Sequence, residues 1–329
     1  MRVLVTGGAG YIGSHMTRML LEDGQAVTVF DDLSTGSRKL LQKRAEFVRG
    51  DLRSAADVKK LFRGRRFDAV IHFAASLVVP ESVEKPLEYY ENNVGSALNL
   101  LKAMDERGVS YFVFSSTAAT YGEPKRMPVR EDDPKEPASP YGMSKLMTER
   151  ILRDFGVARP TFRYAALRYF NVCGAHPSGE LGAMKEKETL LIPNVLRAIR
   201  QGPKHPLHVF GDDYPTSDGT CVRDYVHVMD ICSAHLLALR YLKRGGKSDV
   251  FNLGSGKGFS VKEVVRTAER VLKMRVPVKI SPRRAGDPSR VVASSTKAGR
   301  LLKWKPAYDL RSIIETAWRW EQRKGQNVT

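Results

Sequence analysis

The sequence predicts an α/β protein built on a Rossmann-type, doubly wound parallel sheet. Three observations predict this fold class: an apolar strand that runs directly into a glycine-rich turn, an acidic residue at the end of the second strand, and strand patterns that alternate with helix patterns over residues 2–253. Such alternation favours a parallel sheet with right-handed crossover connections. Ligands of these sheets bind beyond the carboxyl ends of the strands, so the expected site lies there.

The first element is the apolar, β-branched run at 2–6, which predicts a buried strand. Gly7, Gly10 and Gly13 follow it at once. Glycines in this place permit a tight turn and let backbone N–H groups approach a pyrophosphate at the start of a helix. The helix itself is expected over 14–21.

The second strand, expected over 26–30, ends at Asp31 and Asp32. Asp31 lies 18 residues after Gly13. A carboxylate at about this distance can accept hydrogen bonds from the adenosine ribose. Since no arginine directly follows Asp31 to receive a 2′-phosphate, the sequence favours NAD over NADP.

The later elements continue the alternation. Further strands are expected over 46–49, 68–73, 110–115, 165–170 and 249–253, and helices over 54–62, 91–107 and 141–155. Small or polar residues stand at the ends of several strands, namely Gly7, Asp31, Asp51, 73–75, 115–117 and Asn171. Because parallel strands end at one edge of the sheet, these residues are expected to gather around one cleft.

Tyr141 and Lys145 lie four residues apart on one of the expected helices, so their side chains share one face. A free phenol has a pKa of about 10 and is a poor base at neutral pH. A nearby ammonium favours the phenolate, lowers that pKa, and lets the tyrosine accept a proton from a substrate hydroxyl. Thr117, after the strand at 110–115, offers a hydroxyl that can share this proton. Taken alone, the Tyr-Lys spacing is typical of any amphipathic helix; beside a dinucleotide turn it indicates hydride chemistry on an alcohol carbon.

Composition limits the other possibilities. The chain has 329 residues, 42% of them hydrophobic, which suffices for one large domain or two coupled ones. Its net charge of +18 could indicate binding to nucleic acid or to an anionic membrane. The basic residues are dispersed and form no long polybasic tail. We therefore favour a bias toward small anionic ligands and expect no nucleic-acid partner.

The sequence shows no apolar run of about 20 residues, so no membrane span is expected. The first residues lack the longer apolar region of a signal peptide. Cys173, Cys221 and Cys232 lack CxxC spacing and indicate reduced thiols in a cytoplasmic protein. The histidine pair His205 and His208 has no further ligand nearby, so no metal site is assigned.

A resemblance to a known family rests on motifs spread over nearly the whole chain. They are MRVLVTGGAGYIGSH at 1–15, VIHFAA at 70–75, ESVEKPLEYYENNV at 81–94, SPYGMSKLMTE at 139–149, LRYFNVCGAHPSG at 167–179, FGDDYPTSDGTCVRDYVHVMD at 210–230, FNLGSG at 251–256 and RRAGD at 283–287. The chain resembles the extended short-chain dehydrogenase/reductases, and within them the UDP-glucose 4-epimerases. Several of these motifs belong to the sugar-nucleotide branch and not to oxidoreductases in general.

The resemblance implies a permanently bound NAD and a UDP-sugar substrate. Tyr141 would act as base on the sugar 4-hydroxyl while hydride leaves C4. The resulting 4-keto sugar would turn over within the site and take the hydride back on its other face. Lys145 would hold the nicotinamide ribose, and Thr117 matches the family's catalytic hydroxyl.

The resemblance also assigns binding residues. Those for NAD are Gly7, Gly10, Tyr11, Ile12, Gly13, Asp31, Asp32, Ser34, Gly36, Asp51, Leu52, Phe73, Ala74, Ala75, Asn92, Ser115, Tyr141, Lys145 and Tyr169. Those for the UDP-sugar are Thr117, Tyr141, Asn171, Leu191, Val209, Phe210, Arg223, Arg284, Asp287 and Val291. Guanidinium groups suit a diphosphate because they can bind it through two parallel hydrogen bonds.

The implied organisation is a large NAD-binding domain and a smaller mixed α/β substrate-binding domain. The first comprises residues 1–171 and a returning segment at about 224–254; the second comprises 172–223 and 255–329. The segment Gly174 to Gly219 is expected to form a lid over the substrate. The resemblance implies a homodimer built on the helices near 91–107 and 141–156, although packing within one subunit would explain their apolar stripes equally.

Some positions depart from the family pattern. Leu77 and Leu190 stand where some members carry polar side chains, and Ala119 replaces a hydroxyl. Val291 aligns with a position that is bulky in some members and small in others, so N-acetylated sugars are a hypothesis. The alternatives left open are a 4-epimerase for another UDP-sugar (UDP-GlcNAc/GalNAc, a pentose or a uronate) and a non-catalytic NAD-binding scaffold. A 4,6-dehydratase is disfavoured because Thr117 is followed by two alanines.

Overall fold

The structure is a computed structural model of the chain, and it describes residues 1–184, 190–284 and 287–326. Within them the largest sheet has seven parallel strands in the order β10-β6-β5-β4-β1-β2-β3. These strands are β1 (Arg2–Thr6), β2 (Ala26–Asp31), β3 (Glu46–Arg49), β4 (Ala69–His72), β5 (Tyr111–Thr117), β6 (Arg163–Tyr169) and β10 (Asp249–Leu253). The order reverses on either side of β1, as in a doubly wound sheet, so the predicted fold class is confirmed.

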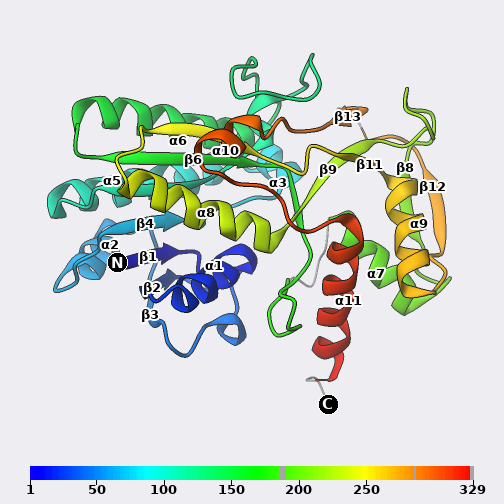
Figure 1. Cartoon of the computed structure of the whole chain (residues 1–329), viewed down its shortest axis with the longest axis horizontal. Helices are drawn as coiled ribbons and strands as arrows, with labels where there is room; N and C mark the ends of the chain where they lie inside the picture. Colours follow the sequence, from blue (N-terminus) through cyan, green and yellow to red (C-terminus); the bar gives the residue numbers. More distant parts are fainter. Residues whose placement is uncertain (185–189, 285–286, 327–329) are drawn as a thin grey trace.

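Helices cover both faces of this sheet (Figure 1). One face carries α1 (Tyr11–Glu22), α8 (Val228–Lys243) and α10 (Thr296–Leu301). The other carries α2 (Ala55–Phe62), α5 (Ser96–Arg107) and α6 (Pro140–Ala158). Burial on both faces explains why inner strands such as β1 and β4 carry apolar side chains at successive positions rather than alternating with polar ones.

Each face of the sheet has its own apolar core, and the side chains of β1 alternate between the two. Val3 and Val5 pack in the cluster with α1 and α8, whereas Leu4 packs in the cluster with α2 and α5. All three side chains are fully buried. The alternation places them on opposite faces because successive side chains of a strand point to opposite sides.

A smaller region lies at the other end of the molecule from the chain's N-terminus (Figure 1). Its strands are β7 (Asn171–Cys173), β8 (Leu207–Phe210), β9 (Val222–His227), β11 (Gly258–Ser260), β12 (Val278–Ser281) and β13 (Arg290–Val291). Its helices are α7 (Leu191–Gln201), α9 (Val261–Leu272) and α11 (Leu310–Gln326). These helices share a third apolar core that includes Ile192, Val264 and Ile313.

Shorter helical segments lie between the strands and helices of the large sheet region. They are the 3-10 turns η1 (Arg38–Leu40) and η3 (Ala118–Tyr121), the helices α3 (Val79–Glu84) and α4 (Pro86–Tyr90), and the π-helical turn η2 (Glu91–Gly95). The helix expected over 91–107 therefore begins with one wide turn before α5. Wide turns of this kind often occur at functional sites, and this one carries Asn92 and Asn93.

The elements expected from the sequence are all present, with shifted ends. The strand expected over 110–115 continues through Thr117. The helix expected from Tyr141 begins at Pro140, because Ser139 caps it by accepting a hydrogen bond from the Gly142 N–H at 3.2 Å and proline suits the first helical position. Residues 185–189 of the expected lid and Ala285-Gly286 of the RRAGD motif lie outside the described residues. In the part of the chain that the structure describes, every helix is too short or too polar to cross a membrane.

Candidate functional site

The glycine turn after β1 is held in a shape that side chains would obstruct. Gly7 has a φ of +72°, and its N–H donates to the Phe30 oxygen at 2.9 Å. A Cβ on Gly7 would come within 2.6 Å of the Ala74 nitrogen, and a Cβ on Gly13 would overlap the Gly7 oxygen. The turn, the end of β4 and the first turn of α1 therefore meet through bare backbone, which is the cradle that a pyrophosphate requires.

Helix α1 begins at this turn, with Gly10 as its N-cap and no side chain capping it. The N–H groups of its first turn therefore remain directed at the glycine turn, and the helix dipole favours an anion there. Tyr11 and Ile12 are the first two residues of α1, so their backbone N–H groups are among those directed at the glycine turn. The Tyr11 hydroxyl itself donates to the Gly174 oxygen at 2.6 Å, so it also ties the turn to the segment after β7.

Asp31 ends β2 beside the turn, as expected. Its carboxylate accepts hydrogen bonds from the N–H groups of Ala9 (3.0 Å) and Leu33 (2.8 Å). Burial raises the pKa of Asp31, and these two hydrogen bonds oppose that rise. A Cβ on Gly36 would meet an Asp31 oxygen at 2.9 Å, so Gly36 lies directly against the carboxylate. The carboxylate keeps lone pairs free for a ribose hydroxyl.

The neighbouring acidic residues are already engaged. Asp32 accepts from the N–H and hydroxyl of Ser34, at 2.8 and 2.7 Å. Asp51 pairs with Arg53 at 2.7 Å, and that hydrogen bond lowers the pKa of Asp51. Leu52, between them, is buried. Asp32 and Asp51 thus shape the loops after β2 and β3, next to the side where adenosine is expected.

The segment after β4 lines the turn from the other side. Phe73, Ala74 and Ala75 are half-buried, and the Phe73 ring packs 4.7 Å from the ring of His235 on α8. The Asn92 amide donates to the Ser76 hydroxyl at 2.9 Å. Its neighbour Asn93 was not identified from the sequence. Asn92 and Asn93 are identical neighbours, so the sequence gives no signal for which of the two side chains points inward.

Asn93 is buried and holds three elements together. Its oxygen accepts from the Ser76 N–H at 2.8 Å, and its amide donates to the Ser76 oxygen and to the Ser144 hydroxyl of α6, at 3.0 and 2.9 Å. The wide π-helical turn is the segment that presents Asn93 to both partners. This contact fixes the segment after β4 against the helix that carries Tyr141.

The residues proposed for catalysis meet between β5 and α6. The Lys145 ammonium donates to the Ser115 carbonyl oxygen at 3.0 Å. The Ser115 hydroxyl is hydrogen-bonded to the Tyr169 hydroxyl of β6. The hydroxyls of Tyr141 and Thr117 are also hydrogen-bonded to each other. The structure thus brings these five side chains together at the carboxyl ends of β5 and β6.

The pKa values in this cluster differ from the sequence expectation. Burial raises the pKa of Tyr141, and it is the hydrogen bond with Thr117 that lowers it. Burial lowers the pKa of Lys145 to about 7, and the charge of Glu149 opposes that change. The Lys145 ammonium points to the Ser115 carbonyl and lies 5.0 Å from the centre of the Phe114 ring. The expected acidification of the phenol by Lys145 is therefore wrong for the protein alone, because burial is the larger effect.

The candidate substrate residues begin where β6 ends. Asn171, two residues after Tyr169, donates to the Asp224 oxygen of β9 at 3.1 Å. Arg223, the preceding residue of β9, forms an ion pair with Asp287 and donates to the Val222 oxygen at 2.9 Å. Arg223 and Asp287, which the resemblance assigns to the UDP-sugar, therefore bind each other.

Arg284 is exposed, and its guanidinium lies 3.9 Å from the centre of the Phe210 ring. Such a stacked guanidinium presents its edge to an incoming anion. Val291 on β13 is paired in register with Arg223, so it borders the same groups. Leu191 is half-buried at the start of α7.

Val209 is placed differently from the expectation for a uracil contact. Its side chain is 2% exposed and packs in the apolar core of the smaller region. The alternation along β8 turns Phe210 toward the accessible side and Val209 away from it. Any contact from Val209 to a ligand must come from its backbone.

Asp224 is a further residue that the sequence did not single out. Its buried carboxylate accepts from the N–H groups of Ser255 (2.7 Å), Gly256 (3.0 Å) and Ala293 (3.1 Å). It thereby joins β9 to the turn after β10 and to the segment that follows β13. The motif VRDY could have indicated it, since an acid beside a ligand-binding arginine often supports the loop around it.

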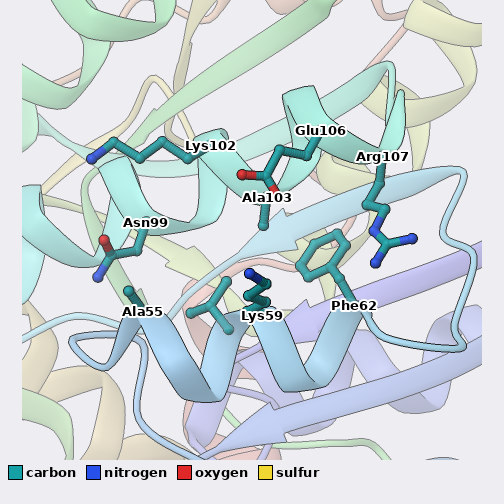
Figure 2. Close-up of a pocket in the computed structure, with 9 residues that line it drawn as sticks. Ala55, Lys59, Phe62, Asn99, Lys102, Ala103, Glu106 and Arg107 are labelled. Atoms are coloured by element: carbon teal, nitrogen blue, oxygen red, sulfur yellow. The ribbon is translucent and has the colours of Figure 1, made fainter.

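A surface hollow of about 150 Å³ lies between α2 and α5, remote in the fold from the catalytic cluster. Figure 2 shows the long side chains of Lys59, Lys102, Glu106 and Arg107 around it, together with the ring of Phe62. It borders the outer side of two helices and not the strand ends, so we assign it no part of the site. The described residues contain no cluster of three or more His, Cys, Asp or Glu side chains suited to a metal.

Comparisons with known proteins show which family the chain matches. Residues 3–254 match the model of the NAD dependent epimerase/dehydratase family. A UDP-glucose 4-epimerase of Lacticaseibacillus casei is 49% identical over 323 residues, which are 98% of this chain and 97% of that protein.

Solved structures are also similar to this chain. A UDP-glucose 4-epimerase from Brucella ovis in complex with NAD has a TM-score of 0.93 and 45% identity, covering 96% of this chain and 97% of that one. One from Bifidobacterium longum in complex with NAD⁺ and UDP has a TM-score of 0.91 and 39% identity, covering 99% of both chains.

Proposed function

The chain belongs to the NAD-dependent epimerase/dehydratase family, and on that premise we propose that it interconverts UDP-glucose and UDP-galactose by inverting the sugar at C4. The observation that carries the proposal is the cluster of Tyr141, Thr117, Lys145 and Ser115 at the strand ends beside the glycine turn. A phenol hydrogen-bonded to a second hydroxyl can pass a proton to and from a sugar alcohol.

The glycine cradle fits NAD. Its bare backbone at Gly7 and Gly13 admits a pyrophosphate, and the Asp31 carboxylate beside Gly36 accepts from a ribose. Bound there, NAD supplies a reversible acceptor for the hydride of the sugar C4. The chain's own residues do the rest: they hold the dinucleotide and move the proton.

The proton is handled by Tyr141 and Thr117. When Tyr141 is ionised, its phenolate oxygen takes the proton of the 4-hydroxyl as the hydride leaves C4, which gives a 4-keto sugar. The proton returns from Tyr141 when the hydride comes back to the opposite face, so no net oxidation occurs. Lys145 places a positive charge behind this exchange, and the Thr117 hydroxyl keeps the phenol aligned.

The smaller region is proposed to bind the UDP. Arg284 and Arg223 are placed to meet a diphosphate, and Asp287 can accept from the uridine ribose once Arg223 turns to the phosphates. This division assigns residues 1–171 and about 224–254 to NAD, and 172–223 and 255–329 to the UDP-sugar. The pairing of Arg223 with Asp287 implies that substrate exchanges one ion pair for another.

The direct test is to mix the purified protein with UDP-galactose, without added cofactor, and to follow UDP-glucose. We expect turnover that needs no added NAD, and NAD in the supernatant after the protein is denatured. The same protein should convert UDP-glucose in reverse. Retention of NAD with no turnover of either sugar would contradict the proposal and favour a non-catalytic NAD-binding scaffold.

We also propose that two copies associate through the helices around α6. Apolar side chains are exposed there: Val83 (62%) on α3, Leu87 (80%) on α4, Leu98 (39%) on α5 and Met147 (38%) on α6. Exposed apolar side chains gathered on neighbouring helices favour a protein interface. Sedimentation of the native protein should give a dimer, and Met147→Glu should shift it toward the monomer. Met274→Glu, at an exposed position of the smaller region, should leave the dimer intact.

A cytoplasmic location is proposed on the cysteines. Cys173 and Cys232 are buried, Cys221 is half-buried, and all three are free. Free thiols are typical of a reducing compartment. Fractionation of the source cells tests this, and recovery of the protein outside the cytoplasm would contradict it.

A further inference from the structure

A buried ion pair lies one helical turn beyond Lys145. The Glu149 carboxylate of α6 accepts from the Arg168 guanidinium of β6 at 2.9 Å from Nε and 2.5 Å from Nη2. Both side chains are at most 5% exposed. A fully buried pair of charges costs desolvation, and replacing it with apolar residues is often neutral or stabilising. Stability alone therefore gives no reason for this pair.

The pair continues into a larger buried network. The Ser116 hydroxyl donates at 2.5 Å to Glu149 Oε1, the oxygen that also accepts from Arg168 Nε. Arg168 also donates to the Tyr121 hydroxyl at 2.8 Å, and Tyr121 donates to the Asn252 side chain at 2.6 Å. The network joins β5, β6, β10, η3 and α6 directly behind the catalytic cluster.

Three residues of α6 hold three successive residues of β5. Tyr141 is hydrogen-bonded to Thr117, Lys145 donates to the Ser115 oxygen, and Glu149 accepts from Ser116. Positions i, i+4 and i+8 lie along one face of a helix, so one face holds the end of β5 at three points. Glu149 is the point that touches no catalytic group directly.

Glu149 also faces Lys145 electrostatically. Burial lowers the pKa of Lys145 to about 7, and Glu149 works against that change. Facing Lys145 from β4 is His72, whose pKa burial lowers to about 3, so this imidazole is neutral and supplies no charge. Tyr141 of α6 and Tyr169 of β6 have pKa values raised by burial and are uncharged phenols at rest. Glu149 is therefore the charged side chain that counters the effect of burial on the pKa of Lys145.

We propose that Glu149, held in place by Arg168 and Ser116, is a positioning residue for the epimerisation: it fixes the end of β5 against α6 and keeps Lys145 protonated behind Tyr141. The proposal rests on the proposed function of the same site. Arg168 orients the carboxylate with two hydrogen bonds and balances its charge against the desolvation cost. Ser116 transmits its position to Ser115 and Thr117 on either side.

The test compares three variants over pH 5.5–9.5. In Glu149→Gln the amide keeps the shape of the side chain but removes its negative charge. The pKa values of neighbouring groups should therefore fall. The whole profile of kcat against pH for UDP-galactose should move toward acid by about one unit, with KM changed little. Glu149→Asp, which keeps the charge, should retain the position of the wild-type profile even where its kcat is lower.

Because Glu149→Gln leaves Arg168 unpaired and can impair folding, the double variant E149Q/R168M removes both charges. We expect it to fold and to show an acid displacement smaller than that of E149Q. A second readout is independent of turnover: the phenolate absorbance of Tyr141, taken as wild type minus Tyr141→Phe, should appear at lower pH in the E149Q background.

Outcomes separate the two proposals. If wild-type protein fails to epimerise UDP-galactose, the proposed function fails, while the phenolate titration still tests the role of Glu149. If wild type is active but E149Q and the double variant keep the wild-type pH profile and phenolate titration, Glu149 is only structural and this inference is overturned. An equal displacement of the profile in Glu149→Asp would overturn it as well.

Discussion

The catalytic cluster and the candidate UDP-binding residues are organised in opposite ways. Around Tyr141 and Lys145 the groups are buried or half-buried and hydrogen-bonded to the strand ends, so their geometry exists before any substrate arrives. In the smaller region Arg284 is exposed and Arg223 is paired with Asp287. The difference teaches that the proposed catalytic groups are positioned by the sheet, whereas the proposed binding of UDP would require Arg223 and Asp287 to exchange partners.

The strongest way to test the preformed cluster is to remove the phenol oxygen. Tyr141→Phe should lower kcat by roughly 10²–10⁴-fold, the usual contribution of a general acid–base group, with bound NAD unchanged. Turnover of UDP-galactose and the NAD content of the purified protein measure this. Tyr111→Phe, at the opposite end of β5, is the matched control and should keep normal turnover. Near-normal activity of Tyr141→Phe would break the comparison.

The second prediction concerns the exposed arginine of the smaller region. Arg284→Ala should weaken UDP binding by about 10–100-fold, the range for a lost hydrogen bond to a charged group, while kcat changes little. Calorimetric titration with UDP measures it. The neighbouring Arg283→Ala is the control, because Arg283 pairs with Asp213 at 2.6 Å instead. Equal effects of the two changes would show a general charge effect and no specific contact.

The third prediction uses buried histidines of the central-sheet region. Burial lowers the pKa of His72 to about 3 and of His235 to about 4, from an ordinary 6.5. Below pH 6.5 the unfolded chain binds protons that the folded protein does not, so the free energy of unfolding falls as pH drops from 6.5 toward 4. The slope should be about 1.4 kcal/mol per pH unit for each such histidine.

Urea unfolding at pH 7.5 and pH 5 measures that slope. His72→Gln should lower this slope by the contribution of one histidine, about 1.4 kcal/mol per pH unit. His205→Gln, at an exposed position, should leave the slope unchanged. A slope that does not respond to His72→Gln would show that the central-sheet region is less tightly closed than the structure indicates. That result would weaken the contrast with the smaller region.

The smallest expected effect concerns sugar selectivity at Val291. The protein should turn over UDP-N-acetylglucosamine as well as UDP-galactose, because Val291, paired in register with Arg223, aligns with a position that is small in some members of the family. Val291→Ala should raise the relative turnover of the acetylated sugar by about fivefold, which corresponds to roughly 1 kcal/mol of relieved packing. No detectable turnover of UDP-N-acetylglucosamine by the unmodified protein, beside normal activity on UDP-galactose, rejects the hypothesis.

The sequence by itself determined the sheet and the glycine turn, and it predicted the residues proposed for catalysis. These features depend on local patterns: the apolar strands, the spacing of Gly7 to Gly13 and the four-residue spacing of Tyr141 and Lys145 are all readable along the chain. The strand ends then follow from topology, since parallel strands finish at one edge. Topology therefore predicts Ser115 and Thr117 at the cleft, whereas Tyr169 was predicted only through the family resemblance.

Only the tertiary structure decided what each side chain does there. Burial, and not the neighbouring ammonium, governs the pKa of Tyr141. The buried pair of Glu149 and Arg168 joins residues 19 positions apart, and the pair of Arg223 and Asp287 joins residues 64 positions apart. Desolvation and long-range pairing depend on which surfaces come together in three dimensions, and no local spacing encodes them.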